Sequence, residues 1–578
     1  MKTATQAIVL GVAFIAALAR AQHPSLRDTP PDGQVSDAVD DYIKKAMSRQ
    51  HIPGLSLVVV RDGKVVKAKG YGLASLELGV PASPETVYGL ASATKPFVAT
   101  AILLLVQDGK ISLEDKVSKY LNETPEAWKS VTIRHLLSHT SGIKDYSSDL
   151  RRAFPHDTSP EKFAQEVMRE PLNFAPGEKW AYSNTGYVLL GMVVLKASGK
   201  SYDAFLQERV FKPLGMKATR RDSPDEVVPN RAAGYLWAGG GSLRNAEFLK
   251  YLTMNQGDGG ILSTAPDLAK FDAALSTDRL LSAPSRDVLW TPVKLNDGKT
   301  HGYGLGWFLE EVNGHKHVYH AGGSPGANSM ISRYPDDRLT VIFLTNGGAA
   351  YAQGLDLGIA QRYVPGLISY KAVKLEPAVL DSYTGYYNAY GQQLLKVTRE
   401  GGVLVLDDGG RLTNEFVPVS DTEFVAADAD RGFTVLRTAK GAVERMTLRL
   451  GSDEMAVQRI GPLISSLKPQ LGADAALTRK VEAVLRAMAK GGKAVEQVPG
   501  LAPQTRRDYS HMGVPEYEGI QSISLLGAQD VAGRGIERHG SKVSRVLYVR
   551  IRTEKAPRNV LVYLTEDGLV TDEDVLRD

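Results

Sequence analysis

The stretch Leu90-Ala91-Ser92-Ala93-Thr94-Lys95-Pro96-Phe97 opens an almost wholly apolar segment that continues to Gln107 and ends at Asp108-Gly109. An apolar run of this length predicts a buried helix. Ser92 is expected at the N-cap of this helix, where backbone N–H groups lack partners within the helix. Lys95 follows about one turn later and close to the same face. The segment therefore brings together a hydroxyl, an amine and free N–H donors.

This S-x-x-K spacing is typical of nucleophilic catalysis. A serine hydroxyl is inert at neutral pH unless a neighbouring group accepts its proton. A lysine can accept it once burial or nearby positive charge favours the neutral amine, and N–H groups at a helix start can hold an oxyanion. The motif by itself has low specificity, because the same pattern recurs at Ser141, Ser159 and Ser465. It also fits a serine-capped surface helix with a solvated lysine.

A second polar motif, Tyr182-Ser183-Asn184, precedes the apolar helix predicted from Tyr187 to Leu195. The Tyr182 hydroxyl is a candidate for passing protons between the nucleophile and a leaving group. The Asn184 amide is a candidate for holding Lys95 and a substrate amide oxygen. The alternative interpretation is a helix-entry turn with a packed tyrosine.

The third motif, His320-Ala321-Gly322-Gly323, follows a predicted strand. Glycines at Gly322 and Gly323 allow a substrate to lie against the strand edge. The N–H of Gly323 is a candidate second donor to an oxyanion, and His320 is a candidate for steering charge or protons at the leaving group. The alternative is a strand-end histidine with no chemical role.

Taken together, these motifs and their flanking sequences resemble the serine β-lactamase-like family. This family includes class C β-lactamases, D,D-carboxypeptidases, D-aminopeptidases and related esterases. The resemblance covers about 37–350. It implies an enzyme without a metal or cofactor in which Ser92 is acylated and water then releases the acyl group. It also implies that Lys95 and Tyr182 share the proton transfers, and that the N–H groups of Ser92 and Gly323 form the oxyanion hole. Further matching stretches are Gly70-Tyr71-Gly72, Asp108–Leu113, Thr132–Gly142, Pro176-Gly177-Glu178 and Gly302–Trp307.

One departure bears on the substrate. Class C β-lactamases carry a lysine where this chain has His320, and a histidine there resembles the peptidase and esterase branches. The expected function is therefore hydrolysis of a peptide, an amide or an ester, of D-peptidase or esterase type. A true β-lactamase and a catalytically silent cell-wall-binding or sensor protein remain alternatives. The particular acyl substrate and the oligomeric state are left open.

Two competing motifs are weaker. Gly322-Gly323-Ser324-Pro325-Gly326 matches the G-x-S-x-G elbow of α/β-hydrolases, but that elbow needs the N–H of the residue after the serine, which Pro325 lacks. His315, His317 and His320 suggest a metal site, yet alternation along a strand puts His320 on the opposite face from the other two. No metal site is therefore expected.

The chain divides into three expected domains. Residues 22–367 are predicted to form the β-lactamase/transpeptidase-like α/β (α+β) hydrolase domain, with one sheet built from both ends of the segment and helices between them. Residues 374–462 show short alternating strands and resemble a small lipocalin-like β-barrel. Residues 473–578 combine an amphipathic helix with strands, a small α+β domain that weakly resembles a cystatin-like fold. Neither tail domain carries a catalytic set, and their role is left open.

The first 21 residues are predicted to be a cleaved signal peptide. Lys2 precedes the apolar stretch Ala7 to Leu18, and Ala19-Arg20-Ala21 has the small-x-small form of a cleavage site. The apolar stretch is too short to span a bilayer, so a periplasmic or secreted protein without stable membrane insertion is expected. The net charge of +4, from 69 basic and 65 acidic residues, gives no basis for nucleic-acid binding. The absence of cysteine excludes disulfides and thiolate metal sites.

Overall fold

The computed structural model describes most of the chain beyond the predicted signal peptide, which lies outside the described residues. The described residues are 32–147, 149, 158–223, 225–239, 242–246, 257–348, 350–389, 393–408, 414–427, 431–439, 441–450, 453–467, 475–510, 514, 517–554 and 556–576. No helix within them is long and apolar enough to cross a membrane.

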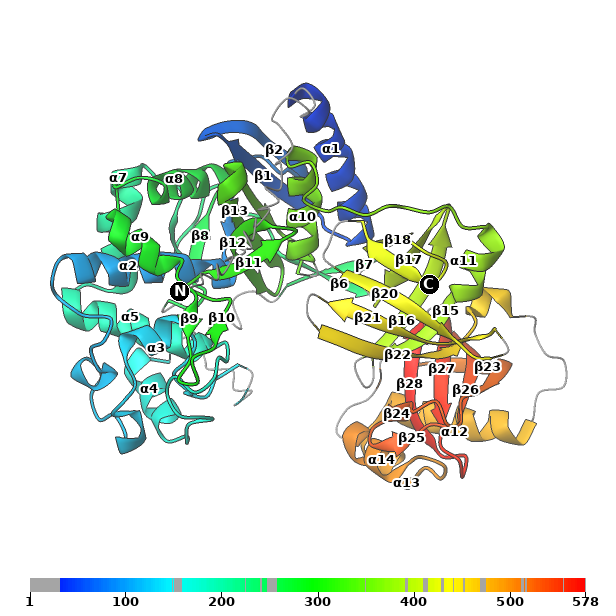
Figure 1. The fold of residues 1–578 in the computed structure, drawn as a ribbon. Helices are drawn as coiled ribbons and strands as arrows, with labels where there is room; N and C mark the ends of the chain where they lie inside the picture. Colours follow the sequence, from blue (N-terminus) through cyan, green and yellow to red (C-terminus); the bar gives the residue numbers. More distant parts are fainter. Residues whose placement is uncertain are drawn as a thin grey trace, which may run out of the picture.

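A seven-stranded antiparallel sheet forms the centre of the hydrolase domain (Figure 1). Strands from the two ends of the segment meet at its middle, where β1 pairs with β14 from Leu55 opposite Thr345 to Arg61 opposite Leu339. This confirms the prediction of one sheet built from both ends. In spatial order the strands are β11 (Phe308–Val312), β12 (His315–Ser324), β13 (Ala327–Tyr334), β14 (Leu339–Thr345), β1 (Gly54–Arg61), β2 (Lys64–Ser75) and β3 (Val80–Pro81).

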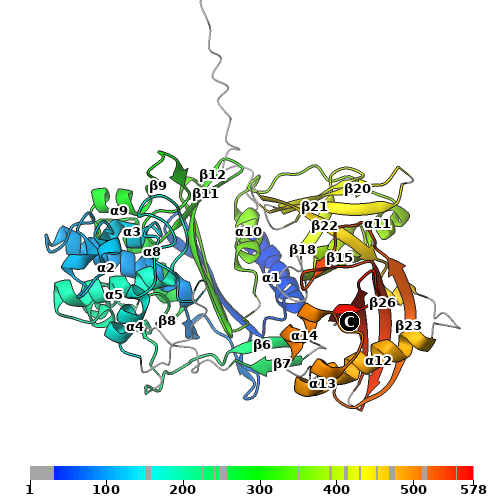
Figure 2. The same cartoon turned by 90° about the horizontal axis from the view of Figure 1, so that it is seen from below.

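Helices cover both faces of this sheet, which accounts for the buried, nearly continuous apolar run of β1. Its residues Leu55, Leu57 and Val59 pack toward α1 (Asp32–Arg49) and α10 (Ala352–Tyr363). Val58 and Val60 belong to the core on the other face. Figure 2 shows the sheet between these two groups of helices. The larger group includes α2 (Lys95–Gln107), α3 (Ile133–Leu137), α4 (Pro160–Met168), α5 (Asn184–Ser198), α6 (Tyr202–Leu206), α7 (Lys212–Leu214), α8 (Ala265–Leu275) and α9 (Ala283–Leu289).

A closed eight-stranded barrel follows the helix α11 (Pro377–Tyr383), which confirms the expected β-barrel. Apolar side chains fill its interior, among them Phe416, Phe424 and Phe433. The barrel packs beside α1, where Arg49 forms ion pairs with Glu400 and Glu415. The strands are β15 (Gly385–Ala389), β16 (Gln393–Glu400), β17 (Val403–Asp407), β18 (Asn414–Pro418), β19 (Glu423–Ala426), β20 (Arg431–Arg437), β21 (Val443–Leu450) and β22 (Asp453–Gly461).

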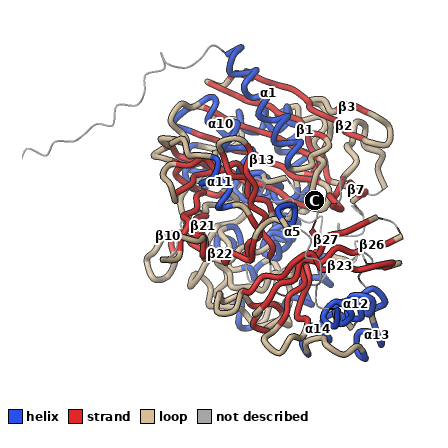
Figure 3. Tube along the Cα trace, turned by 90° about the vertical axis from the view of Figure 1, so that its right-hand side faces the viewer, coloured by secondary structure: helices blue, strands red, loops and turns tan. Residues whose placement is uncertain are grey.

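The last part of the chain forms a four-stranded antiparallel sheet with helices, in agreement with the expected α+β composition. Figure 3 shows the helices gathered beside the strands. The amphipathic helix predicted for this part of the chain is α12 (Ala475–Lys490), and its apolar stripe, including Val484 and Met488, is buried. The other elements are α13 (Gly492–Gln497), α14 (Pro503–Tyr509), β23 (Ile520–Asp530), the short paired strands β24 (Glu537–Arg538) and β25 (Ser541–Lys542), β26 (Arg545–Thr553), β27 (Pro557–Leu564) and β28 (Val570–Leu576).

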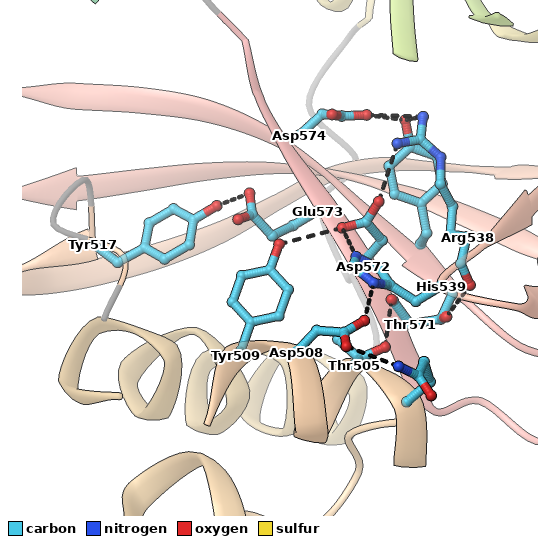
Figure 4. A network of polar contacts seen from close by, with 12 residues as sticks. Thr505, Asp508, Tyr509, Tyr517, Arg538, His539, Thr571, Asp572, Glu573 and Asp574 are labelled. Atoms are coloured by element: carbon cyan, nitrogen blue, oxygen red, sulfur yellow. Dashed lines mark hydrogen bonds and ion pairs between the residues drawn. The ribbon is translucent and has the colours of Figure 1, made fainter. Parts of the chain in front are cut away.

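A polar network joins α14 to β28 in this terminal domain (Figure 4). The buried Arg538 guanidinium pairs with Asp572 and Asp574 at 3.0 Å each. His539 lies between Asp508, at 2.6 Å, and Asp572, at 3.3 Å. A buried guanidinium and the buried carboxylate of Asp572 are stable together only because each has a partner of opposite charge, and the partly exposed Asp574 adds a second carboxylate. The network therefore fixes the helix against the sheet.

Candidate active site

The backbone around Ser92 has an unusual shape. Ser92 is the second residue of a 3₁₀-helix (Ala91–Thr94) that runs directly into α2, rather than the N-cap that the sequence suggested. The turn begins one residue earlier because Ala91 has a left-handed backbone, with φ of 45°. Such a conformation in a residue with a side chain is strained and persists only where its surroundings hold it. Hydrogen bonds from Ala93 N and Ser329 Oγ to the Leu90 carbonyl hold it here.

Lys95 is buried, and its amine contacts three oxygen atoms. The Nζ atom lies 3.2 Å from Ser92 Oγ, 2.9 Å from Asn184 Oδ1 and 2.8 Å from the carbonyl oxygen of Asp258. Two of these partners are carbonyl oxygens and can only accept hydrogen bonds. They accept from two N–H groups of the amine, so the remaining position of Nζ faces the Ser92 hydroxyl, where a neutral amine has its lone pair. The arrangement can therefore take the proton of Ser92.

Asn184 is held in one orientation by the loop that follows α3. Its Nδ2 donates to Ser147 Oγ at 3.1 Å, which leaves Oδ1 to accept from Lys95. The buried Asp145 carboxylate accepts hydrogen bonds from the backbone N–H groups of Asn184 and Thr185 at the start of α5. A carboxylate at a helix N-terminus satisfies donors that have no partner in the helix. The loop thus positions the amide that holds the lysine.

Two residues that no sequence motif indicated, Asp258 and Tyr146, complete the surroundings of Lys95. The Tyr146 hydroxyl donates to Asp258 Oδ2 at 2.7 Å, while the Asp258 carbonyl accepts from Lys95. Burial raises the pKa of Asp258 to about 6, although nearby Lys95 and the hydrogen bond from Tyr146 act in the opposite direction. Neither residue lies in a recognisable motif, so only the fold reveals that they meet at the lysine.

Tyr182 lies beside the lysine but does not bind it. Its ring centroid is 4.9 Å from Lys95 Nζ, and the ring also packs near His139, with ring centroids 4.3 Å apart. Within the described residues no hydrogen bond joins its hydroxyl to Ser92 or Lys95. The structure therefore places Tyr182 at the site, and its part in proton transfer stays a prediction.

The strand β12 forms the opposite wall of the site. Its pairing with β11 ends at Tyr319 opposite Phe308, so among the described strands the segment from His320 to Ser324 is paired only with β13. Gly322 must be glycine, because a Cβ there would collide with the carbonyl oxygen of Leu90. The strand can therefore approach Ser92 closely and offer Gly323 at a free edge. The role of Gly323 in the oxyanion hole stays a prediction.

His320 is buried in the wall of the site. The residue is 1% exposed, and both ring nitrogens have partners: Tyr303 Oη at 3.2 Å from Nε2, and the Ala321 carbonyl at 2.7 Å from Nδ1. Burial, reinforced by nearby Lys95, lowers the pKa of His320 to about 3. The ring is therefore neutral at physiological pH, and contact with substrate stays a prediction. The other two histidines of the suggested metal set contact Asp337 (His315) and Asp356 (His317) instead.

The carboxylate of Asp145 offers a direct test of how Asn184 is positioned. Asp145→Ala is expected to destabilise the hydrolase domain by about 1 kcal/mol, as loss of a helix cap does, and to lower kcat by releasing Asn184. Urea unfolding and ester hydrolysis measure the two effects. Ser159→Ala removes the exposed cap of α4 and serves as control. An equal fall in kcat in both variants would contradict the positioning role.

A serine beside a buried lysine amine, facing a free strand edge, defines a serine hydrolase with an S-x-x-K site. Comparison with known proteins gives the same class, since residues 39–363, more than half of the chain, match the family model described as Beta-lactamase. The chain therefore belongs to the Beta-lactamase family.

Individual relatives extend this comparison. The chain is 34% identical over 445 residues to "Penicillin-binding protein 4*" of Bacillus subtilis, covering 72% of this chain and 97% of that protein. Its fold is similar to the octameric penicillin-binding protein homologue from Pyrococcus abyssi, with a TM-score of 0.53, 27% identity and coverage of 73% and 100%. It is also similar to the D-amino acid amidase from Ochrobactrum anthropi SV3, with a TM-score of 0.50, 25% identity and coverage of 58% and 98%.

Proposed function

We propose that the protein is an exported hydrolase that works through an acyl-enzyme on small peptides, amides or esters. Ser92 Oγ attacks the carbonyl carbon and passes its proton to Lys95. The leaving group departs with a proton supplied through Lys95 and Tyr182, and the acyl group stays on Ser92. Water then attacks the acyl-enzyme, releases the acid and restores the serine. The observation that carries this proposal is the contact of 3.2 Å between Lys95 Nζ and Ser92 Oγ at a buried amine.

An amide or ester substrate is favoured over a β-lactam by the character of β12. His320, two residues before Gly322, is a buried neutral histidine, so the strand offers no fixed cation next to its glycines for the carboxylate that β-lactams carry. The D-amino acid amidase relative was solved with L-phenylalanine amide bound, which supports an amide as the substrate class. Rapid nitrocefin hydrolysis would favour the β-lactamase alternative.

Labelling with a fluorophosphonate and with a penicillin tests the acyl-enzyme directly. Both probes are expected to modify a single serine, and peptide mapping by mass spectrometry is expected to place it at Ser92. Labelling at another serine would refute the assignment. Failure of every probe would support the catalytically silent alternative. A panel of D- and L-aminoacyl amides, esters and nitrocefin on the same preparation then ranks the substrate classes.

Export is the second element of the proposal, and it rests on Lys2, the apolar stretch and Ala19-Arg20-Ala21. Cleavage after Ala21 leaves a mature chain that begins at Gln22. N-terminal sequencing of the protein isolated from cells is expected to find that start outside the cytoplasm. A chain that retains Met1 would contradict export by this route.

A further inference from the structure

Two histidines and a tyrosine near the active site do not contact the Ser92 hydroxyl or the Lys95 amine. His139 lies in the stretch Thr132–Gly142, Tyr303 in Gly302–Trp307, and His320 before the glycines of β12. The three residues are far apart in sequence but meet beneath the active site. All three are buried, with exposed fractions of 1%, 0% and 1%. Buried polar side chains of this kind need hydrogen-bond partners.

The three side chains form one continuous hydrogen-bonded chain. His139 Nε2 lies 3.1 Å from Tyr303 Oη, and Tyr303 Oη lies 3.2 Å from His320 Nε2. At the His139 end, the backbone N–H of Ser183, the N-cap residue of α5, donates to His139 Nδ1 at 3.0 Å. The second end rests on the sheet, where His320 Nδ1 lies 2.7 Å from the Ala321 carbonyl. The three hydrogen-bonded side chains therefore join the segment before α5, which carries Tyr182, to the strand β12, which carries Gly323.

The backbone at each end determines where every proton lies. The Ser183 N–H can only donate, so His139 Nδ1 is the acceptor and Nε2 carries the proton. The Ala321 carbonyl can only accept, so His320 Nδ1 carries the proton and Nε2 is the acceptor. Tyr303 then accepts from His139 and donates to His320. One arrangement satisfies all four bonds, and it leaves neither nitrogen of His320 available to a leaving group.

We propose that His139, Tyr303 and His320 are positioning residues that set the spacing between Tyr182 and the Gly322-Gly323 edge of β12. In this role His320 holds the strand through Tyr303 and does not donate a proton to the leaving group. Tyr182 is positioned in the same way, because its ring packs against His139. The inference rests on the proposed acyl-enzyme function, because it assigns a role to residues around that site.

Electrostatics support this role. Burial lowers the pKa of His139 well below its usual range, and nearby Lys95, His320 and His301 lower it further. The imidazole rings of His139 and His320 therefore stay neutral at physiological pH. A neutral ring keeps its single proton on the nitrogen that the backbone contacts select. Protonation of His139 would put its Nδ1–H against the Ser183 N–H, and protonation of His320 would remove the acceptor for the Tyr303 hydroxyl.

Ester hydrolysis by three variants tests the positioning role. Tyr303→Phe removes one hydroxyl and both bonds of the chain, and is expected to lower kcat about 100-fold with a smaller change in KM, the size of effect that small displacements produce. His320→Gln keeps an acceptor for Tyr303, whereas His320→Leu of similar size keeps none. The glutamine variant is expected to retain about tenfold more activity than the leucine variant, as one hydrogen bond accounts for. Equal losses in the two would mean that the acceptor for Tyr303 does not explain the role of His320 and would overturn the proposal.

Tyr334→Phe is the matched control, because it removes a buried hydroxyl on the other face of the same sheet. If it lowers kcat as much as Tyr303→Phe does, the effect is general destabilisation and the proposal fails. Nitrogen-15 NMR of the histidine-labelled protein provides a readout that needs no substrate. His139 is expected as the Nε2–H form and His320 as the Nδ1–H form, without titration from about pH 5 to 9.

The two readouts also separate this inference from the proposed function. Failure of Ser92 to react with any probe refutes the acyl-enzyme, whatever the tautomers are. Reaction at Ser92 together with the opposite tautomers, or with a ring that titrates in this range, refutes the positioning chain alone.

Discussion

Replacing Ser92 with alanine is expected to lower kcat for p-nitrophenyl ester hydrolysis by about 10⁶-fold, the loss seen when a serine nucleophile is removed. The reason is that, among the described residues, Ser92 supplies the only hydroxyl bonded to the Lys95 amine, whose other partners are the carbonyl oxygens of Asn184 and Asp258. Measurements need a fully purified variant, since traces of wild type would mask the residual rate. Turnover within tenfold of wild type would exclude Ser92 as the nucleophile.

Lys95→Met tests whether the amine works as a unit with Ser92. Loss of a proton acceptor in general base catalysis lowers rates by about 10²–10⁴-fold. The double variant Ser92→Ala with Lys95→Met is expected to be no slower than Ser92→Ala alone, because residues that act in one step show non-additive losses.

A second S-x-x-K motif within the chain supplies a matched control. Ser159 and Lys162 have the same spacing, but they lie at the start of the exposed helix α4, where Ser159 caps the Lys162 N–H. Ser159→Ala and Lys162→Met are therefore expected to leave kcat at the wild-type value. A loss of activity in these variants comparable to that at Ser92 would show that the S-x-x-K pattern alone had been misleading.

The contrast between these two motifs shows what the sequence reveals about the site. Both fit the pattern, and the apolar helix after Ser92 distinguished them, because it predicts burial of the lysine. The meeting of Lys95 with Asn184 was also predicted, since both belong to motifs at helix starts. Asp258 was not predicted, because its carbonyl contacts Lys95 through the tertiary fold and any residue type has a carbonyl.

The strands of the fold likewise divide into those that the sequence reveals and those that it does not. Strands with nearly continuous apolar residues, such as β1 and β14, can be recognised from the sequence. The strand β13 was missed although it is wholly buried, since its sequence ANSMISRY mixes apolar with polar residues. Its polar side chains are satisfied by distant partners, as where Ser329 donates to the Leu90 carbonyl and Ser332 to Asp356. Such partners become known only from the tertiary structure.

A buried charge on β12 leads to the second large effect, on stability. His317 is 2% exposed, and its Nε2 lies 3.0 Å from Asp356 Oδ2 on α10. Its Nδ1 lies 3.8 Å from Glu310 Oε2 on β11. Burial alone would lower the pKa of His317, but the two carboxylates outweigh it and raise the pKa to about 9. The charged ring thus ties α10 to the strand that carries the active-site glycines.

This elevated pKa makes the stability of the hydrolase domain depend on pH. The folded protein binds the His317 proton more tightly than the unfolded chain, whose histidine pKa is near 6.5. The stabilisation is therefore complete below about pH 6.5, declines as pH rises, and is lost above about pH 9, with a total of about 3 kcal/mol.

His317→Gln isolates this contribution, because other titrating groups cancel in the difference from wild type. All five tryptophans, at positions 128, 180, 237, 290 and 307, lie in the hydrolase domain, so tryptophan fluorescence follows the unfolding of that domain without interference from the barrel or the last sheet. The variant is expected to be less stable than wild type at pH 6 by about 3 kcal/mol more than at pH 10. A difference that stays constant over this range would show that the ring is neutral, and that hydrogen bonding without charge holds α10 to the sheet.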